Sequence, residues 1–163
     1  MCIAAIYYVM NLRRISQSQK TQLVLNMATM NTHKEYMKQY SDVVHHYQWK
    51  NYDEWAEKYS GVVNPEAHAT LLAEMNKLVY SGTLLHEKLV DPNLLYSYSA
   101  PTRVILTWEK IGPIIKRWRE LYNDPKLGYY AEYLYDETLK RFPDVRVPSL
   151  AERYPSLVSI QKS

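Results

Sequence analysis

Closely spaced histidines and carboxylates are the residues of this chain with the clearest potential for chemistry. Asp42 precedes His45 by three residues and His46 by four, so a helix would bring Asp42 beside either imidazole. These ligands form half of a metal site, which Glu66 or His68 would have to complete from another part of the fold. We favour solvent-facing or hydrogen-bonded histidines instead. We predict no metal ligands and no cofactor at the histidines, which are His33, His45, His46, His68 and His86.

Motifs of nucleophilic and phosphate chemistry are missing from the sequence. The single cysteine, Cys2, lies in an apolar stretch with no base beside it. Four isolated glycines provide no loop that could hold a phosphate group. Glu132 and Asp136 are explained by ion pairing with Lys140 along one helix face. We therefore predict no catalytic residues and a protein that is not an enzyme.

A basic and aromatic segment runs from Trp108 to Trp118 and includes Lys110, Lys116 and the nearby Arg119. Such a surface can stack nucleic-acid bases or bind anionic lipid. The two tryptophans fall at helical spacing with apolar residues, however, which favours a position in the core. The formal net charge of +3 is too small to indicate nucleic acid on its own. A soluble helical regulatory or nucleic-acid-binding module is therefore kept as the alternative function.

Apolar residues recur at helical spacing along most of the chain, and no segment shows the period-two alternation of strands. We predict an all-α fold, a helical bundle of four to five main helices preceded by a long N-terminal helix with a break near Asn31 and Thr32. The 163 residues, 47% of them hydrophobic, allow one core of modest stability. The predicted divisions are an N-terminal apolar stub and juxtamembrane helix over 1–32, a helical domain over 33–142 and a proline-containing irregular tail over 143–163.

Capping residues and helix breakers predict where individual helices begin and end. Asn64 and Asp91 are each followed by a proline, which is the typical start of a helix. Ser81-Gly82 predicts the end of the helix that Asn64 begins. Ser99 is the predicted cap of a later helix, which Pro113 is expected to interrupt.

An uncharged apolar run from Cys2 to Met10 is the strongest indication of cellular location. It is about half as long as a membrane-spanning helix requires. The run can be the second half of a membrane helix, a short interfacial anchor, or ordinary core. We favour the first, because arginines and tyrosines flank membrane helices at their cytoplasmic boundary. This predicts a membrane-anchored protein whose helical domain lies in the cytoplasm. The residues predicted to contact the membrane are Ile3, Ile6, Tyr7, Tyr8, Val9, Met10, Arg13 and Arg14.

Four groups of short segments are informative through their order along the chain. They are Leu72-Ala73-Glu74-Met75-Asn76, Ser81-Gly82-Thr83-Leu84 with Leu89-Val90-Asp91, Trp108-Glu109-Lys110-Ile111 with Pro113, and Tyr129-Tyr130-Ala131-Glu132-Tyr133-Leu134-Tyr135. Over about residues 1–140, the chain resembles a family of small uncharacterised prokaryotic proteins with an N-terminal membrane helix and a helical domain of unknown function. The resemblance implies a topology and no catalytic residue. The short apolar start and the segment His86-Glu87-Lys88 depart from the family pattern.

These features predict a non-enzymatic, membrane-proximal helical protein that acts through protein–protein interaction or self-association. The expected partners are membrane lipid, through the N-terminal segment, and either a protein partner or a second copy of the chain. Nucleic acid is not favoured. The 16 tyrosines against one phenylalanine fit a thin bundle with solvated edges, and they fit a tyrosine-rich interface equally well.

Overall fold

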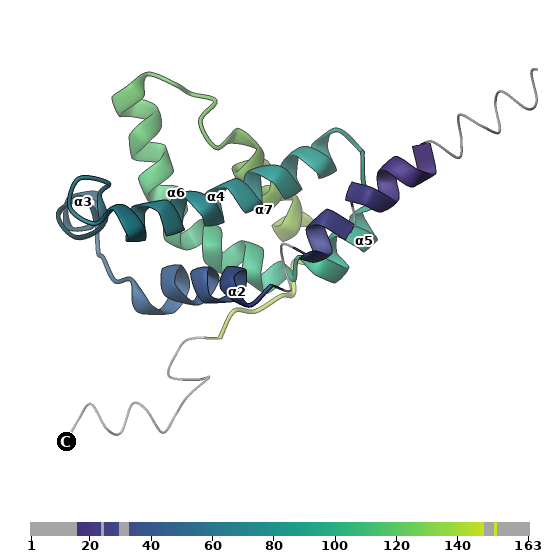
Figure 1. The fold of residues 1–163 in the computed structure, drawn as a ribbon, viewed down its shortest axis with the longest axis horizontal. Helices are drawn as coiled ribbons and strands as arrows, with labels where there is room; N and C mark the ends of the chain where they lie inside the picture. The colour runs from purple at the N-terminus through teal and green to yellow at the C-terminus, as the bar shows by residue number, and fades with distance from the viewer. Residues whose placement is uncertain (1–15, 24, 30–32, 149–151, 153–163) are drawn as a thin grey trace, which may run out of the picture.

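Helices make up the fold, which confirms the predicted all-α class. The computed structural model describes residues 16–23, 25–29, 33–148 and 152, and no strand occurs among them. Residues 16–23 and 25–29 are helical and form the N-terminal helical segment. Its later end packs on the other helices through Met27, and its N-terminal end projects away from them (Figure 1). The elements that follow are α2 (Lys34–Ser41), the π-helix η1 (Asp42–His46), α3 (Tyr52–Tyr59), α4 (Pro65–His86), α5 (Pro92–Tyr98), α6 (Pro101–Tyr122) and α7 (Tyr129–Arg141).

The two longest helices, α4 and α6, form the centre of the fold together with α7 (Figure 1). Each of the two has 22 residues and buries apolar side chains along its length. Leu71 from α4, Ile111 from α6 and Leu134 from α7 are each at most 1% exposed. Full burial of such a side chain contributes about 1.5–3 kcal/mol. The contact between these three helices is therefore the main source of stability.

Helix α4 begins where the sequence predicts but ends later. The Asn64 side chain accepts a hydrogen bond from the Ala67 backbone N–H at 3.0 Å, which confirms the predicted start. The predicted end at Gly82 is wrong, because the helix continues to His86. A Cβ on Gly82 would lie 1.9 Å from the carbonyl oxygen of Tyr130 in α7. This glycine therefore allows two helices to approach closely and does not terminate one.

Helix α6 continues past Pro113 to Tyr122, so the predicted interruption does not occur. Pro113 is exposed, and its ring therefore displaces no core side chain. Asp91 caps α5 with its side chain, as predicted. Ser99 ends α5, and Ala100 is the residue that precedes α6, so the predicted cap of α6 is wrong by one position.

Aromatic packing attaches α3 to α4 and α6 at one end of the molecule (Figure 1). Trp55 of α3 is 2% exposed and meets Trp118 of α6 edge to face, with 5.4 Å between ring centroids. His68 of α4 lies 5.9 Å from Trp55 and 5.7 Å from Trp118. Asn51 caps α3 by accepting a hydrogen bond from the Glu54 backbone N–H at 2.9 Å. The side chains of Trp55, His68 and Trp118 therefore join α3, α4 and α6.

Helix α2 lies on the outside of the fold and has no buried residue. Its continuation, η1, buries Val43 completely. Earlier in the chain than α2, Met27 of the N-terminal helical segment is 1% exposed. The apolar side chains that anchor this region therefore lie before and after α2 and not on it.

The prediction of a membrane-anchored protein with its helical domain in the cytoplasm is wrong. Among the residues that the structure describes, no helix is both long enough and apolar enough to cross a bilayer. The residues predicted to contact the membrane, from Ile3 to Arg14, lie outside the described part of the chain. The break expected at Asn31 and Thr32 also lies outside it. The domain boundaries at residues 32 and 142 remain predictions.

Candidate functional site

Four aromatic rings from α4 and α7 meet at the surface of the molecule, and we call them the tyrosine surface. His86, the last residue of α4, lies 4.9 Å from Tyr133, 5.3 Å from Tyr130 and 6.1 Å from Tyr129, measured between ring centroids. Tyr129 and Tyr130 are 5.2 Å apart. All four pairs meet edge to face, which is a favourable arrangement of aromatic quadrupoles.

Two glycines place these rings together. Gly128 is the N-cap of α7 and has a φ of +66°, a left-handed conformation that other residues rarely adopt. This turn lets α7 begin directly at Tyr129. Gly82 then allows the backbone of Tyr130 to lie against α4. The position of the tyrosine surface is therefore fixed by the backbone and not by the side chains alone.

A hollow of about 300 Å³ opens beside the tyrosine surface and is lined by Lys126, Tyr129 and Tyr130. Tyr129 is 47% exposed. Within the described part of the chain, the Lys126 ammonium forms no ion pair. Burial, followed by the charge of Glu137, raises the pKa of the Tyr133 phenol, which therefore stays protonated and can donate a hydrogen bond. The hollow and the adjoining tyrosine surface together thus offer apolar area, a cation and hydroxyl donors.

A second feature is a buried ionic cluster, formed by Glu74, Lys77 and Arg103. Glu74 is 2% exposed, and its carboxylate accepts a hydrogen bond from the Lys77 ammonium. Lys77 also donates to the Gln39 side-chain oxygen at 3.2 Å and lies 4.5 Å from the centre of the Tyr36 ring. Burial raises the pKa of Glu74 and lowers that of Lys77, whereas the hydrogen bond between them opposes both shifts.

Arg103 completes the attachment of α2 to the ionic cluster. Its guanidinium lies 4.6 Å from the centre of the Tyr40 ring, and its Nη1 contacts the Met37 sulfur at 3.6 Å. Cation–π contacts of this kind contribute about 0.5–2 kcal/mol, depending on desolvation. Because α2 has no buried residue, the two cations of the ionic cluster supply much of what holds this helix to the rest of the fold.

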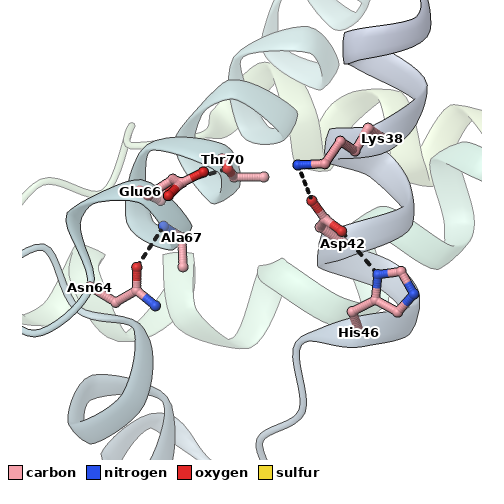
Figure 2. A network of polar contacts seen from close by, with 7 residues as sticks. All are labelled: Lys38, Asp42, His46, Asn64, Glu66, Ala67 and Thr70. Atoms are coloured by element: carbon pink, nitrogen blue, oxygen red, sulfur yellow. Dashed lines mark hydrogen bonds and ion pairs between the residues drawn. The ribbon is translucent and has the colours of Figure 1, made fainter.

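The predicted half-site is formed, but no third ligand joins it. His46 Nδ1 lies 2.9 Å from Asp42 Oδ1, and the Lys38 ammonium lies 3.4 Å from the other carboxylate oxygen (Figure 2). The hydrogen bond from His46 and the charge of Lys38 hold the pKa of Asp42 below its usual value. Glu66 and His68, the proposed completing ligands, do not join this pair: across the described residues no three potential ligands come together.

The remaining predicted histidines contact aromatic rings. His45 lies 6.0 Å from the Tyr40 ring, and His33 lies 5.7 Å from Tyr36. His68 differs from the expectation of a solvent-facing or hydrogen-bonded side chain. Its ring packs on two indoles, and its buried Nδ1 has no hydrogen-bond partner among the described residues.

The tryptophans of the basic and aromatic segment are core residues, as predicted. Trp108 is 4% exposed and Trp118 is 7% exposed. Neither indole therefore offers a free face on which a nucleic-acid base could stack. Lys110 of the same segment lies 4.2 Å from the centre of the Trp49 ring.

Glu132 connects α7 to α6 through this basic segment. It lies 2.6 Å from Arg119 Nη1 and 3.3 Å from the Lys116 ammonium. The predicted pairing of Glu132 with Lys140 along one helix face is wrong, because Lys140 pairs with Glu137 instead. The basic groups of α6 are therefore partly neutralised within the fold.

The ionic cluster was not predicted from the sequence, although one signal for it exists. Glu74 lies three residues after Leu71 and four before Leu78, on the apolar stripe of α4. A carboxylate at such a position requires a buried partner. The tyrosine surface has no comparable signal, because His86 and Tyr129 are far apart in the chain.

Comparison with known proteins identifies the family. Residues 1–138 match a family described as a domain of unknown function, DUF4760. The chain belongs to this family. No curated protein and no solved structure matches it. Membership of an uncharacterised family, which the resemblance implied, is thereby confirmed.

Both features described above lie inside the DUF4760 region. The ionic cluster and the tyrosine surface fall between residues 74 and 133, within the match to residues 1–138. The predicted tail, residues 143–163, lies beyond it. The two features therefore belong to the domain that defines the family.

Proposed function

We propose that this DUF4760 domain is a non-catalytic interaction module that binds an acidic, proline- or aromatic-containing segment of a partner protein at the tyrosine surface. The observation that carries the proposal is the convergence of four aromatic rings from two helices beside a hollow of about 300 Å³. Tyrosines supply large contact areas with little loss of conformational entropy, and they are enriched where proteins bind one another.

Charge supports an acidic partner. The Lys126 ammonium at the hollow and the exposed Lys88, two residues after His86, form no ion pair within the described part of the chain. A carboxylate of the partner would meet the Lys126 ammonium while an adjacent apolar side chain entered the hollow. At about 300 Å³ the hollow is at the small end of ligand pockets, so it suits one or two side chains of a bound segment.

A peptide library displayed on phage provides the test, with the full chain as bait. We expect selected peptides to share a carboxylate next to a proline or an aromatic residue. Tyr129→Ala and Lys126→Glu should each weaken their binding at least about tenfold, which corresponds to about 1.4 kcal/mol. Tyr122→Ala is the matched control, because Tyr122 is 70% exposed but lies outside the tyrosine surface.

Two results would overturn the proposal. One is a selection in which no peptide is enriched, or in which the enriched peptides bind the Tyr129→Ala and Tyr122→Ala variants equally well. The other is a chain that forms a stable dimer in light scattering and becomes a monomer on Tyr129→Ala. That outcome would assign the tyrosine surface to self-association.

A further inference from the structure

A small cavity lies against the ionic cluster, between the N-terminal helical segment and the two central helices. Its volume is about 20 Å³, and its lining includes Met27, Glu74, Ser81, Arg103 and Thr107. A cavity of this size holds one particle of about the dimensions of a water molecule. Met27, which is 1% exposed, shields this side of the cavity from solvent.

Two hydrogen-bonding atoms at this cavity have no partner among the described residues. They are Nη2 of Arg103 and Oγ1 of Thr107, both buried. Thr107 is only 1% exposed, so water at the protein surface does not serve its hydroxyl. Ser81 and Ser99, each 7% exposed, add two further hydroxyl groups to the lining. An unpaired buried polar group destabilises the folded state, and a charged one does so more strongly.

The charges around the cavity do not balance. Glu74 is paired with the Lys77 ammonium and is also attracted by the Arg103 guanidinium, so one carboxylate faces two cations and the cluster keeps one excess positive charge. The other contacts of Arg103, with the Tyr40 ring and the Met37 sulfur, involve neutral groups. Glu35 is the further carboxylate that acts on Lys77, but it is exposed on α2 and screened by solvent.

We propose that this cavity is a binding site for one small monovalent anion of the size of chloride. The anion would accept hydrogen bonds from Arg103 Nη2 and the Thr107 hydroxyl, and it would neutralise the excess charge. A water molecule can pair with the same donors and with the hydroxyl oxygens of the lining, but it carries no charge. A monovalent anion also neutralises the excess positive charge of the cluster.

The site connects three parts of the chain. Thr107 and Arg103 belong to α6, Glu74 belongs to α4, and Met27 belongs to the N-terminal helical segment. An anion at this point therefore stabilises the packing of the N-terminal helical segment on the two central helices. This role is independent of the tyrosine surface, which lies on α4 and α7.

Thermal unfolding of the full chain tests the site, with chloride exchanged for gluconate at constant ionic strength. Gluconate is too large for the cavity. We expect the melting temperature to rise by about 3 °C between 5 and 150 mM chloride, as mass action requires for an ion that binds only the folded state. Crystals soaked in bromide should show an anomalous peak in the cavity, within hydrogen-bond distance of Thr107 and Arg103.

Matched variants separate this site from general salt effects. Thr107→Val keeps the shape of the side chain and removes the hydroxyl. The apparent affinity for chloride, taken from how the melting temperature depends on chloride concentration, should therefore fall at least about tenfold. Thr102→Val makes the same change at an exposed position of α6 and should leave the dependence intact. Thr107→Ser retains the hydroxyl and should keep the chloride dependence. If the valine variant does not fold, the bromide-soaked crystals of the wild-type chain provide the test.

The proposal is wrong if the wild-type chain melts at the same temperature in chloride and gluconate. It is also wrong if bromide-soaked crystals show only a water molecule in the cavity. A chloride response that Thr107→Val and Thr102→Val share equally would assign the ion to another place on the protein. These results leave the test of the tyrosine surface unaffected.

Discussion

Asp42 has two partners on its own helical face, the imidazole of His46 at 2.9 Å and the ammonium of Lys38 at 3.4 Å. The hydrogen bond from His46 and the charge of Lys38 depress the pKa of this carboxyl in the folded state. A depressed carboxyl pKa contributes stability that is present above the unfolded pKa and is lost as the pH falls through the folded pKa. Asp42 is therefore one of the groups through which acid destabilises this fold.

The variant Asp42→Asn measures this contribution. We expect it to lower the free energy of unfolding by about 1 kcal/mol at pH 7, with the difference from wild type shrinking as the pH falls below about 4 and through the folded-state pKa of Asp42. Urea titrations at several pH values provide the measurement. Asp136→Asn, at an exposed position of α7, is the control. A difference that stays constant down to pH 3 would contradict the assignment.

Among single residues, sequence spacing predicts local contacts well. The proximity of Asp42 and His46 follows from their separation by four positions, which is a property of any helix. The contacts of Glu74 and Arg103 do not follow from spacing, because α4 and α6 must first pack together. The tyrosine surface likewise depends on how His86 meets Tyr129, a tertiary relation that no local pattern encodes.

Between elements, the contact of α4 with α7 depends on one missing side chain. A Cβ on Gly82 would lie 1.9 Å from the carbonyl oxygen of Tyr130. That distance is far inside van der Waals contact, and the obstructing atom belongs to the backbone, which cannot rotate away. Helix α7 would have to move as a unit.

Gly82→Ala tests this contact. In an ordinary helix, glycine to alanine stabilises by about 0.5–1 kcal/mol. Here we expect the opposite sign and a loss of about 3 kcal/mol or more, as for overpacked cores. Asn76→Ala, at an exposed position of the same helix, is the control for helix propensity. A Gly82→Ala variant as stable as wild type in urea would show that α7 adapts to the added methyl group.

The same glycine explains why helix starts were predicted better than helix ends. The starts at Asn64 and Asp91 depend on side chains that cap their own helix, which is a local interaction. The end of α4 depends on whether Gly82 breaks the helix or serves a neighbour, and that is decided by packing. Ser99 was misassigned for a related reason, since it ends one helix just before the next begins.

Across the whole molecule, stability is unevenly distributed. The long helices α4 and α6 and the shorter α7 share the buried core, whereas α2 has no buried residue and is held by the cations of the ionic cluster. Elements with few buried apolar contacts open locally at lower free energy than the core. The fold therefore has a firm centre and a more weakly attached outer helix.

Native-state hydrogen exchange provides a direct comparison of the two regions. Amides of α2 should exchange at least about a hundredfold faster than those in the middle of α4 and α6. Lys77→Met should increase exchange in α2 further while leaving the middle of α7 nearly unchanged. Equal protection of α2 and α6 would show that the cationic contacts hold α2 as firmly as a buried apolar face would.

The packing of Trp55 on Trp118 has a consequence for how this fold can be observed. Their ring centroids are 5.4 Å apart and the indoles meet edge to face, in a fixed orientation inside the core. Electronic transitions of chromophores this close couple to one another, so the pair should give a distinctive circular dichroism signal. Since one indole belongs to α3 and the other to α6, that signal reports the docking of two helices without any attached label.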